Sequence, residues 1–336
     1  MARFFMGLAM SDYAEEKIRE WQNTELNILN KRLDHLSRRL YNTYEPAKYL
    51  GEPFWSRFVN WLKNPGLSDE DQKHLFRLAS EIFYIGPEEF EELYRTAYSK
   101  NFATWLIDQI NINFTDGAFE REFSAALSQT WFCPISDSMR INGFYHINNV
   151  NTPSDFRPDW RSMAIFSDIQ RLKDYCARQD IKYLVLLEDF VGGGSQMMPA
   201  VMHALELAPD VKILLIPLVI CPRGAETARR LAECYSDLTF SPVLQVPQDM
   251  FVTAETNNAF YQAVSTLAHS TFHMVAPNHP GASLEKPYHP LGFPPPPDEP
   301  TGGLIVMYSN TPDNSIPLLH WTSSEWRPLF PRHSRI

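Results

Sequence analysis

The feature that most constrains the fold is an apolar run that ends in two acids and three glycines, IKYLVLLEDFVGGGSQMMPA, at residues 181–200. The aliphatic residues 184–187 are typical of a strand buried on both faces of a parallel sheet. Glu188 and Asp189 follow at its predicted carboxyl end, where open α/β sheets bind ligands. The glycines can adopt positive φ and expose backbone N–H groups to an anion at the start of the next helix. The stretch therefore predicts a strand, a phosphate-binding loop and a helix.

Other glycine motifs fit this stretch less well. A methyltransferase loop would space its glycines as G-x-G-x-G after a single acid, whereas here the three glycines are contiguous and the acids are paired. A hydrolase elbow needs G-x-S-x-G, but Met197 stands where the last glycine belongs. A P-loop would need Lys followed by Ser or Thr. An ordinary strand-to-helix turn is the remaining alternative, although an acid pair at the end of a buried strand costs stability unless it is used.

At these residues the chain resembles the type I phosphoribosyltransferase family. In that family an acid pair faces the ribose hydroxyls of phosphoribosyl diphosphate, and a short loop before a helix holds its 5′-phosphate. The resemblance implies that Glu188 and Asp189 are the catalytic acid pair. It also implies a phosphate loop made of Gly192, Gly193, Gly194, Ser195 and Gln196. Two positions that usually carry hydroxyls are Gly193 and Gln196 here, so binding is implied more strongly than catalysis.

More specifically, the chain is similar to phosphoribosyltransferase-like proteins of bacterial conflict systems, including retron and other antiphage loci. Three blocks carry the similarity, at residues 130–148, 183–196 and 309–330. The similarity implies an effector that acts on or binds phosphoribosyl diphosphate or a related nucleotide, with Mg²⁺ carried by that ligand and no direct metal site. It implies as partners the other proteins of a defence locus, among them a reverse transcriptase with its DNA.

A second loop is expected beside the acid pair, after a strand predicted at residues 130–135. In the resemblance this loop holds the diphosphate of the donor. Hydroxyl groups can donate hydrogen bonds to it, arginine can neutralise phosphate, and aspartate can order a metal through water. The residues concerned are Ser136, Asp137, Ser138 and Arg140. Taken alone, the Ser-Asp-Ser sequence is also common in ordinary turns.

The polar residues 142–158 fall where a phosphoribosyltransferase flap would close over the donor, and Tyr145 and His146 are candidates for contact with the acceptor or the diphosphate. A solvated connection with a packed tyrosine explains them equally well. A last strand is predicted at residues 304–308, and it would reach the edge of the acid pair if it were parallel. The tail residues expected to face the pocket are Asn310, Asn314 and Arg332.

The order of predicted elements favours two domains. Residues 1–115 are expected to form an all-α accessory domain that serves assembly, because amphipathic and aromatic-rich helices fill it. Residues 116–336 alternate strands and helices, which predicts a mostly parallel α/β sheet of type I phosphoribosyltransferase-like topology, with a Pro-rich loop at 277–303 and a C-terminal tail. One helix carries a seam typical of a short coiled coil or of a helix packed on its own domain, formed by Leu26, Leu29, Leu33, Leu36 and Leu40.

Composition excludes some classes of function. With 30 basic and 40 acidic residues among 336, the net charge of −10 argues against bulk nucleic-acid binding. The four cysteines show no C-x-x-C spacing, and His273, His279 and His289 match no ligand motif, so neither zinc nor a disulfide framework is indicated. No apolar run approaches the about 20 residues of a membrane span. A cytoplasmic homo-oligomer is expected.

Overall fold

The structure, a computed structural model, describes residues 12–21, 24–110, 117–150, 169–253, 257–277, 289–293 and 301–333. The chain divides into two compact units. The sheet unit is Glu88–Pro247, and the helical unit combines Met1–Pro87 with Gln248–Ile336. This division differs from the predicted boundary at residue 115, because the C-terminal quarter of the chain joins the N-terminal helices rather than the sheet.

The sheet unit contains a five-stranded parallel sheet in the order β2-β3-β4-β5, with β6 pairing beside the end of β4. Aliphatic side chains of the two central strands are fully buried, as expected for a sheet covered on both faces. The strands are β2 (Thr130–Pro134), β3 (Tyr183–Val191), β4 (Lys212–Ile220), β5 (Leu238–Phe240) and β6 (Leu244–Gln245). The predicted fold class, a mostly parallel α/β sheet with helices at the N-terminus, is confirmed.

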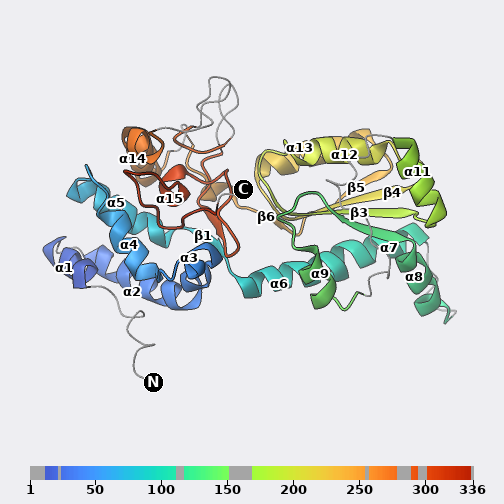
Figure 1. Cartoon of the computed structure of the whole chain (residues 1–336), viewed down its shortest axis with the longest axis horizontal. Helices are drawn as coiled ribbons and strands as arrows, with labels where there is room; N and C mark the ends of the chain where they lie inside the picture. Colours follow the sequence, from blue (N-terminus) through green and yellow to red (C-terminus); the bar gives the residue numbers. More distant parts are fainter. Residues whose placement is uncertain are drawn as a thin grey trace. The chain divides into compact units, whose positions relative to one another are not determined.

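Helices cover both faces of this sheet (Figure 1). One face carries the crossover helices α11 (Ile169–Arg178), α12 (Met197–Leu205) and α13 (Pro222–Cys234). The opposite face carries a continuous helical segment and two shorter helices: α6 (Pro87–Thr96), the π-helical turn η2 (Ala97–Phe102), α7 (Ala103–Ile110), α8 (Phe119–Ser128) and α9 (Ile141–Ile147). The strands β2 to β5 lie in the sheet in the same order as in the sequence. Because each connection between them is right-handed, the three crossover helices lie on the same face.

The continuous segment α6–η2–α7 is fixed to the sheet by buried aromatic and polar side chains. Phe102 contacts Phe132 of β2 with ring centroids 4.7 Å apart. Asn101 donates to the Ser241 carbonyl at 3.0 Å, and the Trp105 indole donates to the Thr239 hydroxyl at 3.1 Å. Residues 97–110 therefore belong to the sheet unit rather than to an accessory helical domain.

The helical unit is built from both ends of the chain. Its second sheet pairs β1 (Phe83–Ile85) in parallel with β7 (Ile305–Met307). Its helical elements are α1 (Asp12–Trp21), α2 (Thr24–Arg39), η1 (Tyr41–Thr43), α3 (Glu45–Tyr49), α4 (Phe54–Leu62), α5 (Asp69–Ser80), η3 (Gln248–Met250), α14 (Ala259–Val275) and α15 (Pro317–His320). The prediction that the last strand joins the sheet of the acid pair is wrong, because β7 takes β1 as its partner. The N-terminal region is also not purely α-helical.

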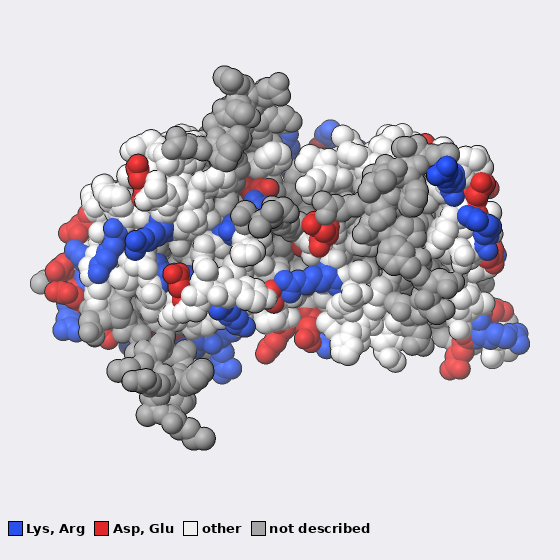
Figure 2. Space-filling view, in the orientation of Figure 1, with Lys and Arg blue, Asp and Glu red and all other residues white. Residues whose placement is uncertain are grey.

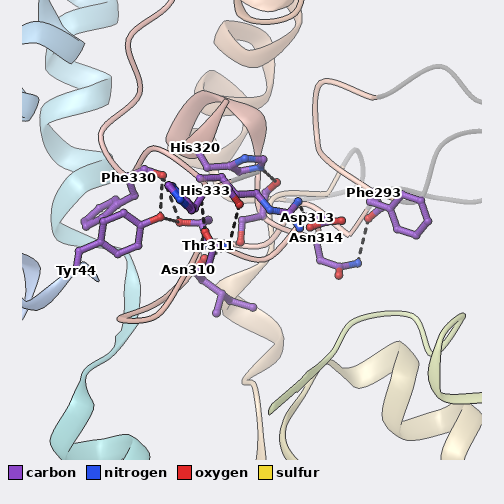
Figure 3. Close-up of polar contacts among 12 residues, drawn as sticks. Tyr44, Phe293, Asn310, Thr311, Asp313, Asn314, His320, Phe330 and His333 are labelled. Atoms are coloured by element: carbon purple, nitrogen blue, oxygen red, sulfur yellow. Dashed lines mark hydrogen bonds and ion pairs between the residues drawn. The ribbon is translucent and has the colours of Figure 1, made fainter. Parts of the chain in front are cut away.

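A buried arginine ties the C-terminal tail to the N-terminal helices. Arg57 is 2% exposed, and it donates to the carbonyls of Leu329 at 2.7 Å and Tyr41 at 3.0 Å. Its guanidinium lies 5.3 Å from the centroid of the Phe330 ring. Burial lowers the pKa of Arg57 to about 10. The same guanidinium lies 5.6 Å from the centroid of the Tyr44 ring, and the Tyr44 hydroxyl shares a 2.9 Å hydrogen bond with Thr311 (Figure 3).

The leucine seam faces the core of its own unit. Leu26 and Leu33 are buried, and the other three leucines pack against the same cluster. The seam lies on α2, which packs on α5. Helix α5 begins with a capping box, in which Ser68 and Asp71 exchange hydrogen bonds. The seam therefore stabilises the helical unit and offers no apolar stripe for assembly.

No helix in the described parts of the chain is long and apolar enough to cross a membrane. Figure 2 shows that on one face of the molecule the described Lys and Arg side chains are interspersed with Asp and Glu.

Candidate functional site at the carboxyl edge of the sheet

Three loops meet at one edge of the sheet unit because β2, β3 and β4 run parallel in adjacent positions. The loop after β2 contains the predicted diphosphate residues. The loop after β3 contains the three glycines, and the chain after β4 enters α13 directly. The carboxyl edge of a parallel sheet is where α/β proteins bind ligands, so this edge is the candidate site.

The acid pair lies inside β3 rather than at its end. Glu188 and Asp189 are 3% and 4% exposed, and the strand continues to Val191. The acids were expected at the carboxyl end of the strand, and β3 runs two residues further than Asp189. It continues because β4 pairs with it as far as Val191, whereas β2 ends opposite Leu187.

Hydrogen bonds connect the acid pair to the loop after β2. The Ser136 N–H donates to Glu188 Oε2 at 2.9 Å, and the Ser138 hydroxyl donates to Asp189 Oδ1 at 2.8 Å. The two serine hydroxyls share a hydrogen bond of 2.6 Å. The structure thus brings together two of the predicted groups, and the buried carboxylates organise this loop directly. Bonds of this kind to carboxylates are stronger than neutral ones.

The rest of the loop after β2 is held from the other face of the sheet. Asp137 and Arg140 are exposed, whereas Met139 between them is buried. Tyr94 of α6 donates its hydroxyl to the Arg140 carbonyl at 3.3 Å. Its ring lies 3.3 Å from the position that a Cβ on Gly143 would take. The loop therefore presents its two charged side chains outward on a fixed backbone.

The glycine loop requires glycine at Gly194 rather than at Gly193. Gly194 has φ +94°, and a Cβ there would lie 3.2 Å from the Met197 side chain. Gly193 has no positive φ, and the nearest atom to its Cβ position is 4.0 Å away. Ser195 and Gln196 are exposed at the start of α12. A glycine loop that leads into a helix fits an anion, and the residue whose positive φ requires glycine is Gly194.

The beginning of α13 belongs to the same site, and the sequence analysis missed it. Gly224 packs so closely that a Cβ would lie 2.4 Å from the Gly192 carbonyl oxygen. Thr227 donates its hydroxyl to the Gly193 carbonyl at 3.5 Å. The available signal was the triplet Pro-Arg-Gly at 222–224, which follows the second buried strand and so reaches the same edge.

The predicted flap residues Tyr145 and His146 lie on α9, which covers one face of the sheet. The Tyr145 hydroxyl donates to the Phe132 carbonyl at 3.3 Å, and His146 is exposed on α9. These contacts favour the packed-tyrosine alternative. Residues 151–158 of the predicted flap lie outside the described residues.

The polar residues of the tail belong to the helical unit. Asn310 donates its amide to the His333 carbonyl at 3.2 Å (Figure 3). Arg332 forms an ion pair with Asp313, and Asn314 donates to the Phe293 carbonyl at 3.2 Å. Their placement beside the acid pair was predicted from a shared sheet, and the pairing of β7 with β1 removes that basis.

Among the described residues, no group of three or more His, Cys, Asp or Glu side chains is arranged to hold a metal ion. His289 Nδ1 instead accepts a hydrogen bond from the Leu291 N–H at 3.0 Å, and His273 is exposed. His279 and most of the Pro-rich loop lie outside the described residues. Four side chains at the candidate site offer oxygen atoms that are joined by hydrogen bonds: those of Ser136, Ser138, Glu188 and Asp189.

A parallel sheet that carries an acid pair and a glycine loop at one carboxyl edge is a phosphoribosyltransferase-like fold. The chain matches PRTase-CE over residues 58–332, and it belongs to that family. The match begins within α4 and includes α5, the whole sheet unit and the tail as far as residue 332, so the family region is not confined to the predicted second domain. Comparisons with curated proteins and with solved structures gave no match.

Proposed function

We propose that the protein binds phosphoribosyl diphosphate, or a related nucleotide, at the carboxyl edge of the sheet unit and transfers its ribosyl phosphate. The observation that carries the proposal is the hydrogen-bonded group of Ser136, Ser138, Glu188 and Asp189 beside the glycine loop. This arrangement offers carboxylates for sugar hydroxyls on one side and backbone N–H groups for a phosphate on the other. Membership of the family supports the same ligand class.

The chemistry asks the chain mainly for positioning. Transfer from phosphoribosyl diphosphate develops oxocarbenium character at the anomeric carbon while the diphosphate leaves. Fixed dipoles and charges stabilise such a state because they need no reorganisation during the reaction. The loop after β2 would orient the diphosphate through Ser136, Ser138 and Arg140, and the glycine loop would hold the 5′-phosphate. Mg²⁺ bound mainly to the diphosphate would neutralise part of its charge.

A non-catalytic module that senses a phosphorylated nucleotide or sugar is the second candidate. The absence of hydroxyl side chains at Gly193 and Gln196 favours it. So does the deep burial of both acids, each of which already accepts a hydrogen bond from the protein. A third candidate is an interaction protein in which the site is vestigial.

Calorimetry separates these candidates. The full chain is titrated with phosphoribosyl diphosphate in the presence of magnesium, and the product is then analysed after incubation with candidate bases. Binding with release of diphosphate supports the transferase, and binding without turnover supports the sensor. If neither phosphoribosyl diphosphate nor nucleotides bind, the site is vestigial and the proposed function is wrong.

The biological role proposed with this activity is that of an effector in bacterial antiphage defence, acting in the cytoplasm with other proteins of its locus, including a reverse transcriptase with its DNA. The similarity of the three sequence blocks to proteins of such loci supports it. A phage-challenge assay with the intact locus tests the role. Glu188→Gln combined with Asp189→Asn should abolish protection, and full protection by this variant would exclude a defence role for the site.

A homo-oligomer is also proposed. Tyr49 and Leu50 support it, because they are 81% and 62% exposed side by side on the helical unit. Light scattering on the wild type and on Tyr49→Ser with Leu50→Ser tests it. A monomeric mass for the wild type would refute it.

A further inference from the structure

Arg223 is positioned at the glycine loop although it comes from the next strand connection. It is the second residue of α13, and its Cδ lies 4.0 Å from the position that a Cβ on Gly193 would take. The residue is exposed. Its aliphatic stem therefore runs beside the loop, within reach of a ligand held there.

The neighbouring residues of α13 fix this position. Gly224 brings the helix backbone against the Gly192 carbonyl, because a Cβ there would lie only 2.4 Å from that oxygen. One turn later, the Thr227 Cγ2 lies 3.4 Å from the Cβ position of Gly194. Contacts on both sides of Arg223 in the sequence thus lock the start of α13 onto all three glycines. The backbone of Arg223 is therefore held at the glycine loop by the packing of its neighbours in α13.

The glycine loop itself supplies no charge. Residues 192–196 are three glycines, a serine and a glutamine. A phosphate monoester carries nearly two negative charges at neutral pH, and arginine binds it through two parallel N–H groups. A loop without charged side chains therefore needs a cation from another element if it is to hold a phosphate tightly.

We propose that Arg223 binds the phosphate of the ligand at the glycine loop and supplies the charge that the loop lacks. The ligand class is a sugar phosphate with an unsubstituted phosphate monoester. The inference rests on the proposed function, because it names the residue that selects a phosphorylated sugar at that site. Arg223 is a binding residue in this scheme, and it takes no part in bond breaking.

The test is calorimetry with two probes, ribose 5-phosphate and phosphoribosyl diphosphate with magnesium. The variants are Arg223→Gln, Arg223→Lys and the control Arg178→Gln. Arg178 is also exposed in the sheet unit, but it ends α11 just before β3 begins, so it lies at the opposite edge of the sheet. Arg223→Gln should weaken the binding of both probes by roughly 10- to 150-fold, as expected for loss of a charge-assisted hydrogen bond. The affinity of Arg223→Lys for both probes should lie between those of Arg223→Gln and the wild type. The affinity of Arg178→Gln should equal that of the wild type.

Two further measurements keep the result unambiguous. Circular dichroism should show the same unfolding temperature for Arg223→Gln and Arg178→Gln, since both side chains are exposed. Raising the salt concentration should weaken ribose 5-phosphate binding less in Arg223→Gln than in the wild type, an effect that a purely structural role would not produce. If the wild type binds both probes and Arg223→Gln binds them equally well, the inference is wrong and the proposed function stands. If the wild type binds neither probe, the inference is wrong, and the proposed function fails as well if nucleotides also do not bind.

Discussion

The close approach of α13 to the glycine loop makes Gly224 the most informative position for mutation. In Gly224→Ala the new Cβ would lie 2.4 Å from the Gly192 carbonyl oxygen and 2.9 Å from a methyl carbon of Val191. The first contact is with backbone, which cannot rotate away, so either the loop or the helix must move. Overpacking of this kind costs about 1 to 3 kcal/mol, and a backbone clash lies at the upper end of that range.

A helical alanine recovers part of this cost. Replacing glycine by alanine inside a helix gains about 0.5 to 1 kcal/mol. The expected net loss of stability for Gly224→Ala is therefore about 2 kcal/mol. Gly193→Ala is the matched control, because that residue has no positive φ and its Cβ would meet no atom closer than 4.0 Å. Its effect should stay within about 0.5 kcal/mol.

Hydrogen exchange of the β3 and β4 amides is the appropriate assay, because a chain of two units need not unfold in one step. A loss of about 2 kcal/mol corresponds to roughly 30-fold faster exchange in Gly224→Ala. Gly193→Ala should exchange like the wild type. If Gly224→Ala were as protected as Gly193→Ala, the packing of α13 on the loop would be refuted.

Three further predictions follow from the same structure. In Glu188→Gln with Asp189→Asn, amides replace buried carboxylates that accept hydrogen bonds from the loop after β2. The protein should be soluble but should lose ligand binding, and the backbone amide hydrogen of Ser136 should exchange faster. Wild-type affinity for phosphoribosyl diphosphate would contradict this. Deleting residues 1–87 should give aggregated protein rather than a soluble α/β domain, because residues 248–336 would lose the core they share with the N-terminal helices; a soluble monomer on size exclusion would contradict it. His320 is 1% exposed, and burial lowers its pKa from 6.5 to about 4. Because the pKa is lower in the folded state, the unfolded state binds the proton first, and stability should fall as the pH drops from about 6.5 to 4, by up to about 3 kcal/mol. Urea unfolding of the wild type and of His320→Gln at pH 7 and pH 5 checks this. An equal loss of unfolding free energy in the two proteins between these pH values would refute it.

Local patterns in the sequence predicted the elements of the sheet unit well. The aliphatic runs became β3 and β4. The loop after β2 and the acid pair were predicted to lie at one edge, and hydrogen bonds connect them. These successes have a common cause. Hydrophobic periodicity is a property of residues close together in the sequence, and alternation of strands and helices is enough to predict a parallel sheet whose carboxyl ends share one edge.

The errors arose where distant segments choose their partners. The last strand has the aliphatic pattern of a central strand, yet it pairs with Phe83–Ile85, which lies in the region predicted to be all-α. Arg57 is buried against the Leu329 carbonyl, far away in the sequence. Neither pairing has a local signal, because each depends on which apolar surface is left uncovered elsewhere in the chain.

The sequence by itself determined the parallel α/β sheet, the edge at which the candidate site lies and the family to which the chain belongs. Those properties rest on buried aliphatic runs and on a short motif, and both can be recognised without knowing any long-range contact. Only the tertiary structure decided that both ends of the chain form one unit, that Gly194 and Gly224 are constrained at the candidate site, and that Arg223 lies beside the glycine loop. These facts depend on how closely two backbones approach in space, and residue spacing along a single segment contains no such information.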